Sequence, residues 1–168
     1  MNTGNTMIRT LFKWPALAAG CGAALTISLL AMLEQYGSEW FSQEQIWLMA
    51  PFGATMVLLF ALPDSPLAQP RNIIAGHIMT TAIGLAVMGL VGVSFWSLGL
   101  AVGLAISLMM LTGTVHPPAG ANPLLVMMTG LPLSFVMTPV ATGVLLIVLM
   151  GWVWHRLIMK RQYPVRWW

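Results

Sequence analysis

The sequence carries very little charge. Only 7% of its 168 residues are charged, 58% are hydrophobic, and the mean hydropathy is +0.85. A soluble domain has about a quarter of its residues charged, whereas this chain has no Asp, Glu, Lys or Arg between Arg71 and Arg156. The composition excludes a water-soluble fold and predicts an all-α membrane protein in which residues 1–168 form a single transmembrane domain.

Residues for covalent, metal or nucleotide chemistry are also scarce. The one cysteine, Cys21, lies in an apolar run, so a disulfide framework is excluded and helix packing is favoured. The three histidines have no accompanying cluster of Cys, Asp or Glu, which argues against a metal site. Nucleophile-elbow, zinc-protease and phosphate-loop motifs are missing. We therefore expect no enzyme activity, no metal and no cofactor.

The basic residues mark topology. Apart from Arg71 they lie near the two ends of the chain, whereas the acidic residues other than Asp64 lie between the first two apolar runs. The basic set is Arg9, Lys13, Arg156, Lys160, Arg161 and Arg166, and the acidic set is Glu34, Glu39 and Glu44. Cytoplasmic flanks of membrane helices collect Lys and Arg. We expect a bacterial inner-membrane protein with both termini in the cytoplasm and no nucleic-acid partner.

Hydropathy predicts about six helical segments, some short or broken, followed by a basic and aromatic cytoplasmic tail at 158–168. The segments are 14–33, 45–62, 73–93, 97–111, 119–128 and 135–157. Polar breaks at 63–72 and 112–122 separate the second from the third and the fourth from the fifth. From Pro51 to Leu62 the chain would rise about 18 Å, short of the ~30 Å hydrocarbon core. Four spanning helices plus two re-entrant half-helices are therefore an alternative.

A faint internal repeat supports the first arrangement. With an offset of 67 residues, Pro51, Gly53 and Ala54 match Pro118, Gly120 and Ala121, each in a P-x-G-A-[TN] motif, and Gly76 and Gly84 match Gly143 and Gly151. The repeats would be 14–93 and 97–157. Because each holds three segments, the second would be inverted in the membrane, as in several transporter folds.

The two P-x-G-A motifs are the first candidate site. Pro51 and Pro118 suit the first turn of a helix, where a missing N–H costs nothing. Gly53 and Gly120 would let a ligand approach the backbone. Helix N-termini attract anions, so two such starts in matching positions, with Thr55 in the first motif, predict an anion site. The alternative is that these residues only end helices and permit tight packing.

The polar residues of the breaks complete the candidate set. His116, before Pro117, can donate, accept or take up a proton, so it is the strongest single candidate for an anion gate or proton-coupled site. For His77, helix packing is the simpler interpretation. Arg71 would pair with Asp64 or attract substrate, or else act as a topology residue. Asn72 and Asn122 can offer amide donors or cap helices.

Two long motifs resemble a known family. PFGATMVLLFALPDSPLAQPRNIIAGH, from Pro51 to His77, and TVHPPAGANPLL, from Thr114 to Leu125, are similar to the HPP integral membrane proteins, and the likeness extends over about residues 15–155. Members are usually described with four transmembrane segments. Plant and cyanobacterial members are associated with nitrite transport, so the resemblance implies a nitrite-like monovalent anion. Asn122 and Pro123 depart from the small or hydroxyl residues expected after HPPAGA.

Two functions follow. The first is a permease or channel for a small inorganic anion, nitrite-like, with a central site at the two motifs, Arg71 supplying attraction and His116 gating or donating. The second is a non-transport scaffold or regulatory subunit that packs against another protein through small-residue faces: Gly76, Gly84, Gly99, Gly103 and Gly143. In either case a six-helix chain of this size buries little of the surface of each helix. We therefore expect a homo-oligomer.

Overall fold

The computed structural model describes residues 3–36 and 47–167, with side chains from residue 15 onward in the first range. These residues form helices and turns without a strand, which confirms the predicted all-α membrane fold with six helical segments. Glu39 and Glu44, the side chains of Arg9 and Lys13, and Trp168 lie outside the described residues.

Four helices are long and two are short. The long ones are α1 (Thr3–Tyr36), α3 (Pro70–Val91), α4 (Phe95–Leu111) and α6 (Thr142–Val153), the last extended by irregular turns at Leu133–Val136, Met137–Ala141 and Trp154–Ile158. The short ones are α2 (Ala50–Met56), continued by a π turn at Val57–Ala61, and α5 (Asn122–Thr129), preceded by a 3₁₀ turn at Pro117–Ala121. A further 3₁₀ turn, Pro66–Ala68, precedes α3.

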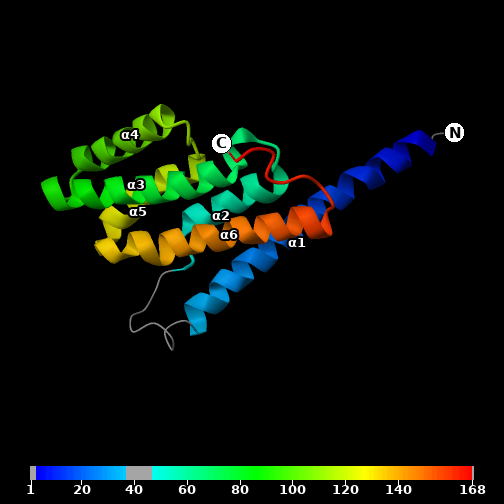
Figure 1. The fold of residues 1–168 in the computed structure, drawn as a ribbon, viewed down its shortest axis with the longest axis horizontal. Helices are drawn as coiled ribbons and strands as arrows, with labels where there is room; N and C mark the ends of the chain where they lie inside the picture. Colours follow the sequence, from blue (N-terminus) through cyan, green and yellow to red (C-terminus); the bar gives the residue numbers. More distant parts are fainter. Residues whose placement is uncertain (1–2, 37–46, 168) are drawn as a thin grey trace.

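Among the described residues, three helical stretches are long and apolar enough to span a bilayer: Pro15–Tyr36, Pro70–Val91 and Leu133–Ile158. With 17 residues, α4 stands at the lower limit of a spanning helix. Successive helices from α1 to α6 run in alternating directions, and α2 and α5 each cover only part of the length of α3 and α6 (Figure 1). Backbone without regular structure at 47–49 and 114–116 leads toward the two short helices α2 and α5, which we call the half-helices.

The boundaries differ from prediction where proline and serine set them. Residues 70–72, expected in a polar break, form the first turn of α3, because Pro70 occupies a position where the missing N–H has no intrahelical partner. Ser94 and Ser97 form a capping box, so α4 begins at Phe95, ahead of the predicted Ser97. The first helix begins at Thr3, well before Trp14.

A long helix of each predicted repeat (14–93 and 97–157) packs against the half-helix of the other repeat, and glycines of the long helix form the contacts. In α3, a Cβ on Gly84 would lie 2.6 Å from the Cα of Pro123 and 2.7 Å from Val126. In α6, a Cβ on Gly151 would lie 2.7 Å from Leu59. Small residues let helices approach closely in a bilayer.

These contacts correspond under the offset of the repeat. Gly84 matches Gly151, and Val126 matches Leu59. About two helical turns earlier, Gly76 lies beside Ala119, and Gly143 lies beside Phe52. Under the same offset Gly76 matches Gly143, and Ala119 matches Phe52. The inverted repeat of 14–93 and 97–157 stays a prediction, and this exchange of matching contacts supports it.

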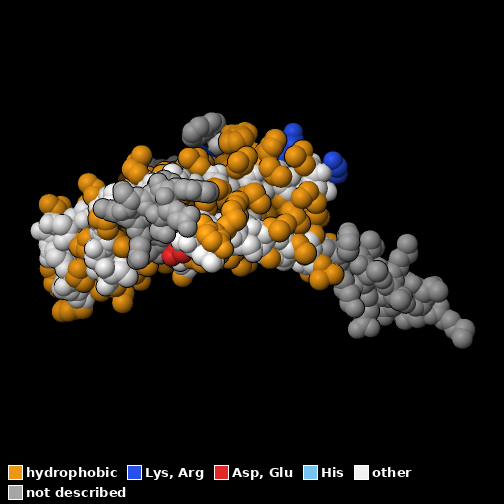
Figure 2. All heavy atoms as spheres, turned by 90° about the horizontal axis from the view of Figure 1, so that it is seen from below, with side chains coloured by type: hydrophobic (Ala, Val, Ile, Leu, Met, Phe, Trp, Pro, Cys, Tyr) orange, Lys and Arg blue, Asp and Glu red, His pale blue; other side chains and the backbone are white. Residues whose placement is uncertain are grey.

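The outside of the bundle is apolar. The view in Figure 2 is dominated by hydrophobic side chains, with the basic groups that it displays near the end from which α1 projects. Leu90, Phe95 and Leu111 are more than four-fifths exposed, at 84%, 90% and 84%. Such a surface suits lipid rather than water.

The segment predicted as a tail folds back onto the bundle. Tyr163 is 1% exposed, and its hydroxyl donates a 2.9 Å hydrogen bond to the carbonyl oxygen of Ala68. Arg161 pairs with Asp64 in the turn before α3. The C-terminal segment is therefore part of the fold at the end of the molecule where α3 begins.

Candidate functional site

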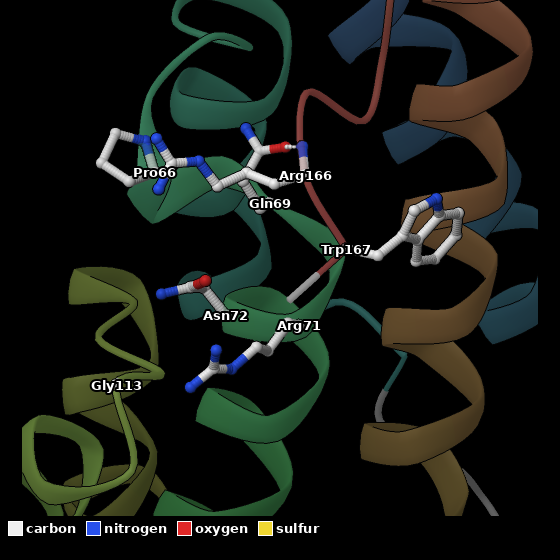
Figure 3. Close-up of a pocket in the computed structure, with 7 residues that line it drawn as sticks. All are labelled: Pro66, Gln69, Arg71, Asn72, Gly113, Arg166 and Trp167. Carbon is white, nitrogen blue, oxygen red and sulfur yellow. Dashed lines mark hydrogen bonds between the residues drawn. The ribbon is translucent and has the colours of Figure 1, made fainter.

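A small pocket opens where the C-terminal segment crosses the start of α3 (Figure 3). Its volume is about 120 Å³, and it is lined by Pro66, Gln69, Arg71, Asn72, Gly113, Arg166 and Trp167. Two of these residues are cationic, and no carboxylate of the described residues lines the pocket. Clefts lined by charge of one sign concentrate counter-ions. We call this the basic pocket.

The turn after α4 holds Arg71 in place. An Nη2 hydrogen of Arg71 is donated to the carbonyl oxygen of Thr112. Gly113 has φ of +64°, a backbone conformation that favours glycine, and a Cβ there would lie 2.8 Å from Arg71 Nη2, so a side chain at this position would also displace the guanidinium. Arg71 does not pair with Asp64, the alternative left open from the sequence, because Asp64 pairs with Arg161.

Gln69 fastens the C-terminal segment to the pocket. Its side-chain oxygen accepts hydrogen bonds from the backbone N–H groups of Val165 and Arg166 at 2.9 and 3.3 Å. Its amide donates to the carbonyl oxygens of Pro63 and Ser65. Burial raises the pKa of the Tyr163 hydroxyl, so this group remains a donor at neutral pH. The chain end that carries Arg166 is thereby held at the pocket.

Below the basic pocket, four polar side chains meet inside the bundle. Thr55 Oγ1 lies 2.9 Å from Nε2 of His77 and 2.9 Å from Nε2 of His116, and Asn122 Nδ2 lies 3.0 Å from Nδ1 of His77. All four side chains are 0% exposed. We call Thr55, His77, His116 and Asn122 the histidine cluster. It joins α2, α3, the segment 114–116 and α5.

When both histidine rings are neutral, the donor and the acceptor of each hydrogen bond in the cluster can be assigned. Nδ1 of His116 lies 2.8 Å from the carbonyl oxygen of Leu67, which only accepts, so this nitrogen carries the hydrogen. Nε2 of His116 can then only accept, and the Thr55 hydroxyl is the donor beside it, with the carbonyl oxygen of Pro51 as the alternative acceptor of the same hydrogen. It follows that Nε2 of His77 donates to Thr55 and that Nδ1 of His77 accepts from Asn122.

Asn122 anchors the far end of the cluster. Its Nδ2 also lies 3.1 Å from the carbonyl oxygen of His77, 3.1 Å from Thr80 Oγ1 and 3.0 Å from Thr81 Oγ1. Its Oδ1 is buried and has no hydrogen-bond partner among the described residues. A buried amide oxygen without a donor costs free energy, so the cluster retains one unused acceptor.

The corresponding positions of the two P-x-G-A motifs meet at His77. Thr55 ends the first motif and Asn122 the second, and they bond to opposite nitrogens of the one ring. Phe52 packs edge-on against this ring at 5.2 Å between centroids, and the ring of His116 lies at 5.1 Å. Gly76 admits His116, whose Cβ would lie 2.9 Å from a Cβ at position 76.

The candidate residues therefore separate into three groups. Thr55, His77, His116 and Asn122 form the histidine cluster, and Arg71 and Asn72 line the basic pocket. Pro51, Pro117 and Pro118 line a surface groove of about 620 Å³ between α2 and the turn before α5. No atom of the described residues lies within 4 Å of a Cβ built on Gly53 or Gly120, so neither glycine is packed against the cluster.

Sequence reasoning missed several groups. Leu67, Gln69, Gly113, Arg166 and Trp167 were not expected at a site, although they bond to the cluster or line the pocket. Arg166 had been assigned to a tail. The hydrogen-bond partner of His116 at Leu67 is a backbone oxygen, which no side-chain pattern reveals. Within the described residues no group of three or more His, Cys, Asp or Glu could hold a metal ion.

Comparison with known proteins gives consistent matches. The family model described as HPP, transmembrane region, matches residues 12–164. One curated transmembrane protein of Dictyostelium discoideum is 37% identical over 134 residues, covering 75% of this chain and 43% of the relative. A second from the same organism is 36% identical over 155 residues, covering 87% and 54%. The chain thus spans about half the length of these relatives. No solved structure matches the chain.

Proposed function

Because the chain belongs to the HPP transmembrane family, we propose that it is a permease for small monovalent anions, with nitrite as the leading substrate. The observation that carries the proposal is the basic pocket together with the buried histidine cluster next to it, in a bundle whose outer surface is apolar. Polar and ionisable groups at membrane depth are costly and usually mark a solute pathway.

The pocket and the cluster are joined by short stretches of chain. Asn72, which lines the pocket, donates a 2.8 Å hydrogen bond to the carbonyl oxygen of Val115, the residue before His116. Pro66, on another wall, precedes Leu67, whose carbonyl oxygen accepts from His116. An anion held by Arg71 is therefore separated from the cluster by the peptides of Val115 and Leu67.

The sign of the charge favours an anion. Arg71 and Arg166 line the pocket without a carboxylate among the described residues, and neutral imidazole, hydroxyl and amide groups form the cluster beneath. Cation pathways are commonly lined by Asp and Glu. The proposed site differs from the sequence hypothesis in its polar groups: they are side chains, among them Thr55 and Asn122, rather than the backbone N–H groups that Gly53 and Gly120 were expected to expose.

The proposed setting is a bacterial inner membrane with both termini in the cytoplasm. The basic pocket lies at the end of the bundle where α1 begins and the C-terminal segment folds back (Figure 1). Lys and Arg near helix ends favour the cytoplasmic side. The pocket would then be the inner opening of the pathway.

The second candidate function, a scaffold or regulatory subunit, has its own observation. Gly99 and Gly103 on α4 have nothing within 4 Å of a built Cβ, and the groove lined by Pro51, Pro117 and Pro118 opens at the surface. These faces suit contact with a second helix bundle, including another copy of this chain. By contrast Gly76, Gly84 and Gly143, expected at such a face, pack inside the chain.

Anion flux into liposomes containing the purified chain tests the proposal. Nitrite, nitrate and chloride are compared in protein vesicles and empty vesicles. We expect nitrite flux above the empty control, and a several-fold reduction at low nitrite in Arg71→Ala. Arg156→Ala is the matched control, because this exposed arginine carries the same charge away from the basic pocket. Absence of flux for every anion would refute transport and favour the scaffold.

A further inference from the structure

The histidine cluster can accept one extra proton without moving a heavy atom. With both rings neutral, the Thr55 hydroxyl hydrogen points to Nε2 of His116. The same Oγ1 also lies 3.0 Å from the carbonyl oxygen of Pro51. Rotation of the hydroxyl hydrogen toward Pro51 frees Nε2 of His116 for a proton, and Thr55 Oγ1 then accepts from both histidines through its two lone pairs.

The extra proton belongs on His116. Once Nε2 is protonated, both N–H groups of this ring have acceptors already in place, Leu67 O on one side and Thr55 Oγ1 on the other. The free nitrogen of His77 is Nδ1, which faces an N–H of Asn122 and so lacks an acceptor for a new hydrogen. The cluster therefore has one proton site, and Thr55 decides whether it is open.

Within the described part of the chain, a proton there would lack a counter-charge. His77 is the titratable side chain that faces His116 from α3, while Arg71 on the same helix bonds to Thr112. The half-helices, α4, the turn Pro66–Ala68 and the turn before α5 contain no acidic or basic residue. Asp64, in the turn before Pro66, pairs with Arg161.

We propose that His116, with Thr55 and His77, is a proton-binding site that couples each monovalent anion to one proton. This inference rests on the proposed permease function and adds its coupling ion. Burying an unpaired cation is costly, so protonation and anion binding favour one another. A proton forms an N–H bond at Nε2 of His116 as the anion arrives, and that bond breaks when the anion leaves. The transported pair carries no net charge.

The experiment measures charge and proton movement together. Vesicles containing the full chain and an internal pH indicator receive nitrite or nitrate, with the membrane potential set by potassium and valinomycin. Flux in protein-free vesicles is subtracted, because undissociated nitrous acid crosses bilayers unaided. We expect protein-dependent acidification with anion uptake, uptake driven by an acidic exterior, and no response to the membrane potential.

The outcomes separate the two proposals. Protein-dependent uptake that follows the membrane potential and ignores the pH gradient would overturn the coupling while leaving the permease intact. Absence of protein-dependent uptake for either anion would overturn both. Acidification in step with uptake supports both.

Variants locate the proton site. His116→Gln retains a polar side chain that cannot be protonated, so we expect uptake to lose its dependence on the pH gradient. His155→Gln is the matched control: this buried histidine bonds to the carbonyl oxygen of Leu59 outside the cluster, and coupling should persist. Persistent coupling in His116→Gln would overturn the assignment.

Thr55 gives a second test that does not depend on His116→Gln being folded. Thr55→Val keeps the shape of the side chain and removes the hydroxyl, whereas Thr55→Ser keeps the hydroxyl. We expect Thr55→Val to lose pH-gradient-driven uptake and Thr55→Ser to retain it. Equal coupling in the two variants would contradict the role of Thr55.

Discussion

The two half-helices of this membrane domain share a framework but differ in the groups they present. One P-x-G-A motif forms the first turns of α2 and the other lies in the 3₁₀ turn before α5, and each half-helix packs against a glycine of the long helix from the opposite half. The second motif is preceded by His116, whereas the matching residue before the first is Met49. The comparison suggests that the repeated part positions the elements and that the unrepeated histidines carry the chemistry.

The same contrast holds at the ends of the motifs. Thr55 presents one hydroxyl between two histidine nitrogens, and Asn122 presents an amide to His77 and to two threonines. A hydroxyl can donate or accept at the same atom, whereas an amide nitrogen only donates. The first half-helix therefore contributes a group that can change its role, and the second contributes a fixed donor.

The largest expected effect concerns the glycine contacts. Gly84→Ala would place a Cβ 2.6 Å from backbone of Pro123, which cannot move independently, whereas Gly143→Ala would meet the ring of Phe52. We expect Gly84→Ala to lower stability by more than the ~1–3 kcal/mol typical of overpacking, and Gly143→Ala by less than Gly84→Ala. Thermal unfolding of the purified protein in detergent measures both.

Gly99→Ala serves as the control for this pair, since nothing lies within 4 Å of its built Cβ. It should unfold at the same temperature as the parent. Equal losses in Gly84→Ala and Gly143→Ala would contradict the expectation that a backbone neighbour tolerates overpacking less than a side-chain neighbour does.

A smaller effect is expected from exchanging the residues that end the motifs. In Asn122→Thr a hydroxyl with one hydrogen replaces an amide nitrogen that faces four acceptors. Buried acceptors are then left unpaired, which should lower the free energy of unfolding by about 1–3 kcal/mol. Thr55→Asn supplies both an N–H for His116 and an oxygen for His77, so it should cost less. Thermal unfolding and nitrite flux of the two variants test this order, and a more damaging Thr55→Asn would contradict the donor assignment.

Much of the fold could be predicted from the sequence. Long apolar runs separated by Pro- and Gly-containing breaks located all six helical segments, since backbone in a bilayer must bond within helices. The start of α3 was wrong because Pro70 was interpreted as part of a break, although proline suits the first helical turn.

The site was predicted only as separate residues. His77, His116, Thr55 and Asn122 were all candidates, but sequence spacing does not reveal that Thr55 bonds to both rings. Helix geometry could have excluded Gly53 from the same face, because residues two apart on a helix point about 200° apart. The basic pocket was missed because Gln69 and Arg166 are brought together by contacts nearly 100 residues apart in sequence.

The smallest expected effect distinguishes the docked C-terminal segment from the membrane core. Tyr163→Phe removes a hydrogen bond to Ala68 and should loosen residues 159–167 by about 0.5–1.5 kcal/mol, without unfolding the helices. The pKa of Tyr163 is raised by burial above its usual 10.0, so docking is fully stabilised below about pH 10 and weakens as the pH rises through the higher pKa of the folded state. Limited proteolysis after Lys160 and Arg161 measures the loosening. At neutral pH the cleavage rate should rise in Tyr163→Phe, and an unchanged rate would show that another group controls docking.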